Sequence, residues 1–250
     1  MCEGRSLRQL PAAAADVIAL STKSEKRSTK GAEAGPRRSP GMSHLVLLGD
    51  SIFDNGAYVR GGPDVVRQLR AVLPEGWRAT LLAVDGATTR DVRAQLARLP
   101  ADATHLVLSA GGNDALGSSG LLYSPARIVG EAVAMLAEAQ HGFDVDYRDM
   151  LAHVLATALP TALCTVYDTP SSAPDHRVIK AALSLFNDRI TRAAFANGLP
   201  LIDLRLICGE DEDYANPIEP SVRGGEKMAR AIARLASGSR EDWRRPLVIS

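Results

Sequence analysis

The sequence contains little cysteine, few aromatic residues and no excess charge of either sign. Its three cysteines, Cys2, Cys164 and Cys208, are too few and too scattered for a disulfide scaffold, and no Cys-x-x-Cys pair predicts a zinc site. A reducing compartment is the simplest fit, so we expect a cytoplasmic protein. The 29 basic and 29 acidic side chains give a formal net charge of zero. Bulk charge therefore supplies no attraction to nucleic acid, and we expect no nucleic-acid partner.

Long apolar runs are also missing. No window approaches the roughly 18 to 20 consecutive apolar residues of a membrane span. The first 20 residues do not read as a secretion signal either, because Glu3, Arg5, Arg8 and Asp16 interrupt or flank their apolar stretch. We therefore expect neither a membrane span nor secretion.

Residues 1–41 differ in composition from the rest of the chain. They carry eight basic and four acidic side chains, a Gly-Pro-Arg-Arg-Ser-Pro-Gly run and no sustained hydrophobic periodicity. Such a segment buries too little apolar surface to offset its chain entropy. We predict a disordered extension over residues 1–41, a folded domain over 42–238 and a solvated tail over 239–250 that includes Trp243.

From Met42 onward, short apolar runs alternate with segments of helical periodicity. This pattern predicts an α/β fold with a parallel sheet of about five strands covered by helices on both faces. We expect strands over residues 45–48, 79–84, 105–110, 161–167 and 201–204, and helices over 63–73, from 88, within 121–159, and over 178–196 and 222–235, the last capped by Ser221.

Polar and glycine-rich segments follow the predicted strands, at the edge where open α/β sheets bind ligands. Ser51 follows the first strand, Gly86 the second and Asn113 the third. A serine on a tight strand-to-helix turn is suited to attack an acyl carbon. The backbone N–H groups of Ser51 and Gly86 and the Asn113 amide would form an oxyanion hole. We expect Asp50 to anchor the turn by accepting backbone N–H bonds.

These motifs resemble those of the SGNH, or GDSL, serine hydrolases. The matching segments are Gly49-Asp50-Ser51, Gly86, residues 111–114 and residues 216–225, and the likeness spans residues 42–235. It implies a flavodoxin-like three-layer α/β/α sandwich and hydrolysis of small-molecule carboxylic esters through an acyl-Ser51 intermediate, without a metal or organic cofactor. Substrates across this family range from lipids and simple esters to acetylated sugars, so the fold does not choose among them.

The last motif departs from the family pattern. The family usually places Asp-x-x-His there, with the histidine as general base, whereas this chain has Asn216-Pro217-Ile218-Glu219. In one interpretation Glu219 is the base of a Ser51–Glu219 dyad, with Asn216 holding its carboxylate. A glutamate pKa of about 4.3 would then have to rise toward roughly 6 or 7 by burial.

Two other interpretations remain open. His176, after the fourth predicted strand, could supply the base, or the chain could be a catalytically weak or inactive module that binds an acyl or carbohydrate ligand. We favour an enzyme, because a site that lacks a triad member still accelerates the reaction roughly 10³- to 10⁴-fold over the rate in water.

Two further segments of the sequence allow predictions. The acidic run at residues 210–213 lacks the spacing of a calcium loop and predicts a solvated loop rather than a metal site. We expect residues 117–147 to line the cleft, with too few aromatic side chains to predict a sugar platform.

Overall fold

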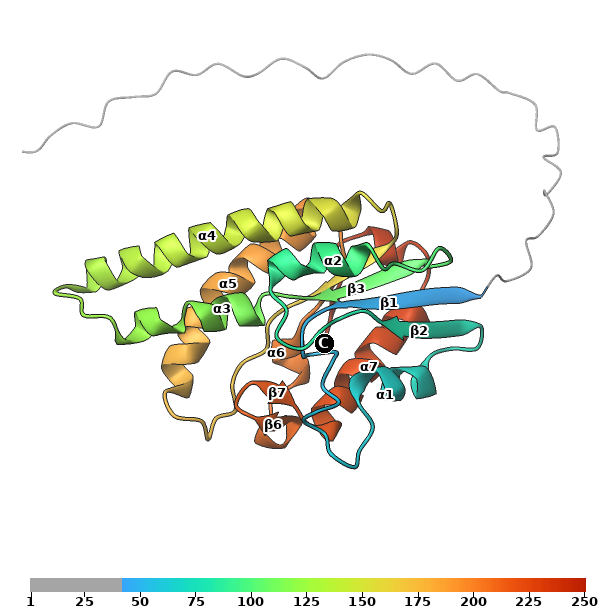
Figure 1. Ribbon diagram of the computed structural model, residues 1–250, viewed down its shortest axis with the longest axis horizontal. Helices are drawn as coiled ribbons and strands as arrows, with labels where there is room; N and C mark the ends of the chain where they lie inside the picture. Colours follow the sequence, from blue (N-terminus) through green and yellow to red (C-terminus); the bar gives the residue numbers. More distant parts are fainter. Residues whose placement is uncertain (1–41) are drawn as a thin grey trace, which may run out of the picture. The chain divides into compact units, whose positions relative to one another are not determined.

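The computed structural model describes residues 42–250, so the prediction for residues 1–41 lies outside the described part of the chain. Its centre is a six-stranded sheet in the order β2-β1-β3-β4-β5-β8, with every neighbouring pair parallel. Figure 1 shows β2, β1 and β3 side by side. The strands are β1 (Ser43–Gly49), β2 (Trp77–Leu81), β3 (His105–Ser109), β4 (Thr161–Cys164), β5 (Leu201–Ile202) and β8 (Val248–Ile249). The predicted parallel sheet is confirmed, with one strand more than expected.

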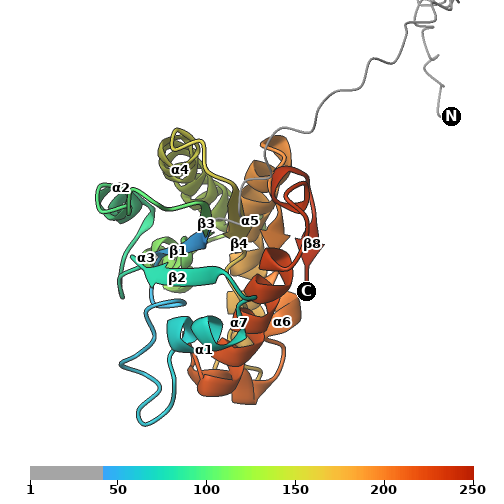
Figure 2. The ribbon, with the colours of Figure 1, turned by 90° about the vertical axis from the view of Figure 1, so that its right-hand side faces the viewer.

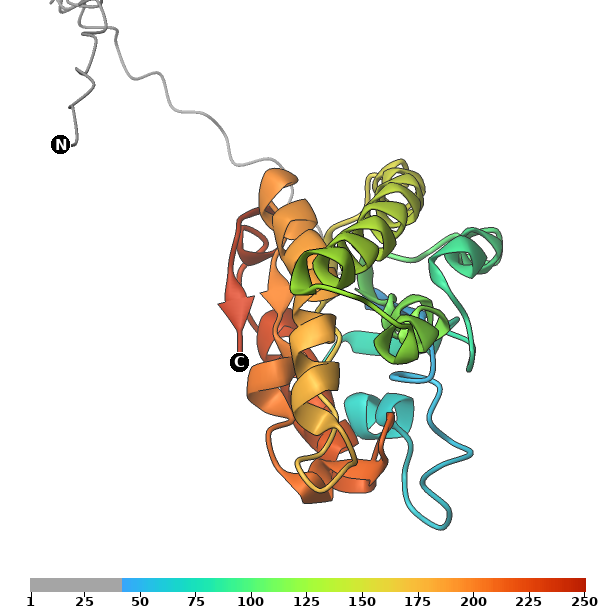
Figure 3. The same cartoon turned by 90° about the vertical axis from the view of Figure 1, so that its left-hand side faces the viewer.

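Helices cover both faces of this sheet, so the predicted three-layer α/β/α sandwich is confirmed (Figure 2). One layer holds α1 (Val65–Val72), α6 (Leu204–Ile207) and α7 (Val222–Ala236); the other holds α2 (Val92–Leu96), α4 (Val129–Leu155) and α5 (His176–Ala196). Figure 3 shows α4 and α5 packed along one another. Shorter helices are α3 (Gly112–Gly117), η1 (Thr89–Asp91), η2 (Ser119–Tyr123), η3 (Asp211–Asp213) and η4 (Asp242–Arg244). Within residues 42–250, no helix has both the length and the apolarity needed to cross a membrane.

The central strand β1 shows why this sequence forms a two-sided sheet. Leu45 and Leu47 pack with α1 and α7, while Val46 and Leu48 pack with α4 and α5. A strand that is buried on both faces needs apolar residues at every position, and not only at alternate ones. The continuous apolar run that predicted this strand is therefore a direct consequence of the covering helices.

Local signals fix several helix boundaries. The Ser221 side chain accepts a hydrogen bond from the Gly224 N–H, which is the predicted cap of α7. Thr88 and Asp91 form a capping box at the start of η1. Helix α5 ends at Asn197, and Gly198 follows with a φ of 65°, a backbone conformation that favours glycine.

The prediction of a solvated tail over residues 239–250 is wrong. Strand β8 pairs with β5 and extends the sheet. Trp243 is only 2% exposed, and its ring lies 4.7 Å from the ring of His105 and 6.3 Å from that of Trp77. A two-residue strand is too short to show periodicity. The basic residues next to Trp243 made this segment resemble an exposed tail, although the Trp243 ring is buried.

Candidate active site

Ser51 lies in a rigid turn at the carboxyl end of β1. Gly49 has a φ of 122°, and a Cβ at this position would overlap the Ser109 carbonyl of β3. The buried Gln95 amide bonds both backbone groups of Gly49, with Oε1 2.8 Å from the nitrogen and Nε2 2.7 Å from the oxygen. Ser51 itself is 6% exposed and lines a cavity. Two strands and one helix therefore fix the backbone from which the Ser51 hydroxyl projects.

Asp50, the neighbour of Ser51, anchors the same turn. Its N–H donates to the Ser109 carbonyl at 3.1 Å, and its Oδ1 accepts from the Ile52 N–H at 3.2 Å. Burial raises the pKa of Asp50 to about 7; the Ile52 N–H opposes this rise, and the negative charges of Glu219 and Asp114 add to it. Near neutrality, therefore, the buried Asp50 carboxyl group next to Ser51 is only partly ionised.

Glu219 begins the second strand of a small hairpin formed by β6 (Tyr214–Asn216) and β7 (Glu219–Pro220). Asn216 is paired with Glu219 across this hairpin. The Asn216 Oδ1 accepts from the Ile218 N–H at 2.9 Å and holds the turn, and within residues 42–250 the Asn216 amide donates no hydrogen bond to the Glu219 carboxylate. Glu219 is 4% exposed and lines the same cavity as Ser51.

The electrostatic environment of Glu219 suits a proton acceptor. Burial raises its pKa to about 7, interaction with the Ser51 side chain lowers it, and the negative charge of Asp85 raises it. Its Oε2 atom is buried and has no hydrogen-bond partner among residues 42–250. A carboxyl group with such a pKa can accept a proton near neutrality and give it back, which an ordinary glutamate does poorly.

The loops after β2 and β3 carry potential oxyanion donors. Asn113, in α3, donates one amide hydrogen to the Ala87 carbonyl at 2.9 Å and keeps a second hydrogen free. Gly86 has a φ of 78° and lies outside the lining of the cavity. Neither the Ser51 N–H nor the Gly86 N–H donates a hydrogen bond within the described part of the chain.

Carboxylates tie these loops to their neighbours. Asp114 accepts from the Thr89 N–H at 3.1 Å and from its hydroxyl at 2.7 Å. The Asp85 N–H donates to Asp54 Oδ2 at 3.0 Å, which joins the Gly86 loop to the turn of Ser51. The three segments that follow β1, β2 and β3 are therefore held together as one unit.

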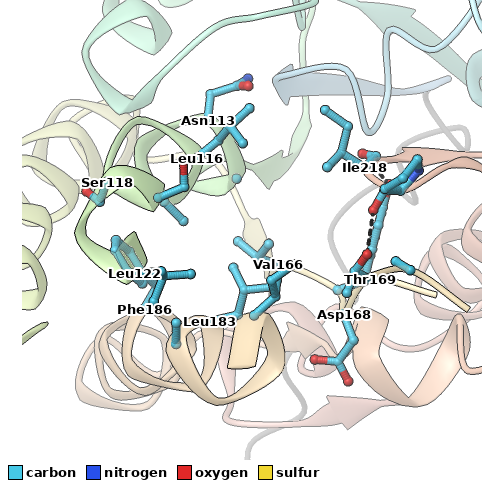
Figure 4. Close-up of a pocket in the computed structure, with 18 of the residues that line it drawn as sticks. Asn113, Leu116, Ser118, Leu122, Val166, Asp168, Thr169, Leu183, Phe186 and Ile218 are labelled. Atoms are coloured by element: carbon cyan, nitrogen blue, oxygen red, sulfur yellow. Dashed lines mark hydrogen bonds between the residues drawn. The ribbon is translucent and has the colours of Figure 1, made fainter. Parts of the chain in front are cut away.

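The cavity has a volume of about 240 Å³ and two unlike ends. Asp50, Ser51, Asn113 and Glu219 lie at its polar end. The rest of the lining is mostly apolar but includes the hydroxyl groups of Ser118 and Ser119, and its apolar wall comes from α3, η2, α4 and α5, with the side chains Leu116, Leu121, Leu122, Leu136, Leu183 and Phe186. Figure 4 shows Leu122, Leu183 and Phe186 gathered on this wall. Part of the segment 117–147 lines the cavity, as the sequence predicts.

All five histidines lie within the described residues, and none lines this cavity. His176, the first residue of α5, is absent from the lining, although Pro174 and Ile179 on either side of it belong to that lining. His141 and His153 belong to α4, and His105 packs between Trp77 and Trp243. His44 is buried near the amino end of β1, whereas Ser51 follows the carboxyl end of this strand.

Other candidate groups have structural surroundings. Asp213, in the acidic run, is buried and pairs with Lys227 Nζ at 2.7 Å, so part of this run is not a solvated loop. Burial raises the pKa of Cys208 to about 12, which makes its thiol unreactive. Among residues 42–250, no three His, Cys, Asp or Glu side chains are grouped so that they could hold a metal ion.

Comparisons with known proteins agree with this architecture. The chain matches the model of the GDSL-like lipase/acylhydrolase family over residues 47–226. No curated protein matches it in sequence. Solved structures with a similar fold include the lipase Lip_vut3 from a goat rumen metagenome, with a TM-score of 0.62 and 22% identity over 79% of this chain and 99% of that chain. An extracellular lipase from Streptomyces rimosus has a TM-score of 0.58 and 18% identity over 78% of this chain and 100% of that chain. An acetyl xylan esterase from Geobacillus stearothermophilus has a TM-score of 0.52 and 21% identity over 79% of this chain and 95% of that chain.

Proposed function

Because the chain belongs to the GDSL-like lipase/acylhydrolase family and is thus a hydrolase acting on ester bonds, we propose that Ser51 is its nucleophile and Glu219 its general base. The observation that carries this proposal is the position of Glu219. Its carboxyl group is buried in the same cavity as Ser51, and its pKa is about 7. A base whose pKa lies near the working pH is the most effective one.

The proposed reaction has two halves. The Ser51 Oγ attacks the ester carbonyl carbon while its proton passes to Glu219, and the carbonyl oxygen becomes an oxyanion. The N–H groups of Ser51 and Gly86 and the free amide hydrogen of Asn113 stabilise this charge. When the tetrahedral intermediate collapses, Glu219 returns the proton to the departing alcohol and an acyl-Ser51 ester remains. A water molecule then attacks this ester, with Glu219 again taking and returning a proton, so that acid and free Ser51 are released.

The apolar wall indicates which part of the substrate enters the cavity. Leucine and phenylalanine side chains from α4, α5 and η2 offer a surface for a hydrocarbon chain, and they outnumber the hydroxyl groups of Ser118 and Ser119 beside them. Asp168, at the edge of this lining, pairs with Lys180 at 2.8 Å and does not present a free charge. We therefore propose that the acyl chain of the ester lies against this wall.

One observation favours a second candidate function. The cavity contains no histidine, which leaves an acyl-binding module with little or no turnover as the alternative. Both candidates bind the same acyl ligand, so only turnover distinguishes them.

The test is hydrolysis of p-nitrophenyl esters of increasing acyl length by the full chain between pH 5 and 9. We expect turnover that rises through pH values near 7, as Glu219 ionises. Glu219→Gln should lower kcat by about 10²- to 10⁴-fold, the usual contribution of a general base. His176→Ala is the matched control and should keep wild-type turnover.

Two outcomes would contradict the proposal. Near-normal turnover in Glu219→Gln would assign the base to another group. Turnover of the wild type no higher than that of Ser51→Ala for every ester would favour the binding module.

A further inference from the structure

Glu219 is flanked by backbone carbonyls that side chains of other segments hold in place. The Ile218 carbonyl accepts from the Tyr167 hydroxyl at 2.8 Å, and the Pro220 carbonyl accepts from Asn55 Nδ2 at 3.3 Å. One residue earlier, the Pro217 carbonyl accepts from the Thr169 hydroxyl at 3.0 Å. The backbone is thus held on both sides of Glu219. The donor to the Ile218 carbonyl lies 51 positions earlier in the sequence, and the donor to the Pro220 carbonyl lies 165 positions earlier.

Two of these donors are themselves buried and fixed. Asn55 is fully buried, and its Oδ1 accepts from the Val65 N–H at the start of α1, at 3.0 Å. Tyr167 is 4% exposed, and its ring packs edge-on against Tyr214, with 5.1 Å between ring centroids. Because these donors are themselves fixed, the position of the Glu219 backbone depends on the positions of α1 and of the segment after β4.

The carboxylate of Glu219, in contrast, lacks an orienting partner. Its Oε2 has no hydrogen bond within residues 42–250, and the Asn216 amide donates none to this carboxylate. In a serine hydrolase triad, an acid orients the base by a direct hydrogen bond. Here the orientation of the base has to come from the backbone that carries it.

We propose that Asn55, Tyr167 and Thr169 are positioning residues that replace the orienting acid, because they fix the backbone of the hairpin so that the Glu219 carboxyl group stays facing Ser51. We call these three side chains the carbonyl clamp. This inference rests on the proposed function, since it requires Glu219 to be the base. It predicts that the clamp acts on turnover only through Glu219.

Loss of a clamp hydroxyl has two physical consequences. A displacement of the base by about 1 Å can lower the rate by about 10²-fold. A loosened hairpin also admits water, which weakens the desolvation that raises the Glu219 pKa. The other titratable groups that act on Glu219 or feel its charge are Asp50, Asp85, Tyr58 and Tyr167. Asp50, Asp85 and Tyr58 keep their places when only the Tyr167 hydroxyl is removed.

The decisive variant is Tyr167→Phe, measured in the full chain. We expect kcat to fall about 10- to 100-fold with KM changed less than about threefold, because the ring that lines the cavity remains. The rising limb of the pH profile should move to lower pH. Tyr214→Phe is the matched control, since its hydroxyl donates to the Cys208 carbonyl, also at 2.8 Å, at the base of the same hairpin. It should lower the melting temperature about as much and leave kcat and the pH profile unchanged.

A double-mutant cycle separates a positioning role from a general structural one. In the Glu219→Gln background, Tyr167→Phe should cause no further loss of turnover, because the base through which it acts is gone. Thr169→Val should lower kcat, and Thr169→Ser, which keeps the hydroxyl, should restore it.

Each contrary result has its own meaning. Folded Tyr167→Phe with wild-type kcat and pH profile would overturn the clamp and leave the proposed function standing, provided that Glu219→Gln is impaired. Equal losses of turnover in Tyr167→Phe and Tyr214→Phe would also overturn it, since general loosening would explain both. Wild-type turnover in Glu219→Gln would overturn the proposed function and the clamp together.

Discussion

The two ends of the sheet hold two different sets of acid, base and hydroxyl groups. Toward the amino end, His44 lies between Asp102 Oδ1, at 3.0 Å from its Nδ1, and Thr80 Oγ1, at 2.7 Å from its Nε2. This is the order of carboxylate, imidazole and hydroxyl found in a catalytic triad. At the carboxyl end, Ser51 shares a cavity with Glu219 and no imidazole is present.

The comparison teaches that the order of the groups does not by itself make a catalytic site. His44 is 1% exposed, and none of His44, Thr80 and Asp102 lines the cavity. The Ser51 end has a cavity, unengaged backbone N–H groups and a carboxyl group with a pKa of about 7. Function depends on space for the substrate and on donors for the developing charge as much as on the base.

The largest effect that would test this contrast is loss of the proposed oxyanion donor at Asn113. Asn113→Ala should lower kcat about 10²- to 10³-fold with little change in KM, because the lost interaction forms fully only in the transition state. Steady-state kinetics with a p-nitrophenyl ester would measure it. Thr80→Val, at the other end of the sheet, is the control and should retain wild-type kcat. A loss of less than about threefold in Asn113→Ala would remove Asn113 from the oxyanion hole.

A second test asks whether His44 serves stability alone. His44→Ala removes a buried ring and both of its hydrogen bonds, so the free energy of unfolding should fall by about 2 to 4 kcal/mol while kcat of the folded enzyme stays unchanged. Urea unfolding together with activity at a permissive temperature would measure both quantities. If turnover were lost while stability was retained, the contrast between the two ends of the sheet would no longer hold.

The third and smallest effect concerns the cost of ionising Glu219. Its pKa is raised from 4.5 to about 7 in the folded state, so the fold favours the neutral carboxyl group. The resulting stability is present below pH 4.5 and is lost as the pH rises from 4.5 to 7. Glu219→Gln stays neutral, and at pH 8 it should therefore gain about 1 to 3 kcal/mol in free energy of unfolding relative to the wild type.

At pH 4.5 the same variant and the wild type should be nearly equal in stability. Denaturant unfolding at the two pH values measures the difference. Glu212→Gln, a substitution of an exposed side chain in the preceding loop, is the control and should stay within about 0.5 kcal/mol at both. A Glu219→Gln variant that gained nothing at pH 8 would indicate that Glu219 ionises without a desolvation cost.

Much of the fold follows from local signals in the sequence. Continuous apolar runs predicted β1 and β3 because both strands are covered on two faces, and Ser221 predicted the start of α7. Strand β8 escaped prediction because two residues show no periodicity, and Trp243 stood among charged neighbours. The site was predictable to the same degree: the residues that follow strands could be listed, but the surroundings of Glu219 and the absence of His176 from the cavity lining could not.

The sequence by itself therefore determined the α/β architecture and the order in which Ser51, Gly86 and Asn113 follow successive strands. These features depend on periodicity and on residues adjacent in the chain. Only the tertiary structure decided that Glu219 is buried with a raised pKa, that its hairpin is held from Asn55 and Tyr167, and that His44 bonds Asp102 and Thr80. Desolvation and hydrogen bonding depend on which distant segments pack together, and no local pattern encodes that packing.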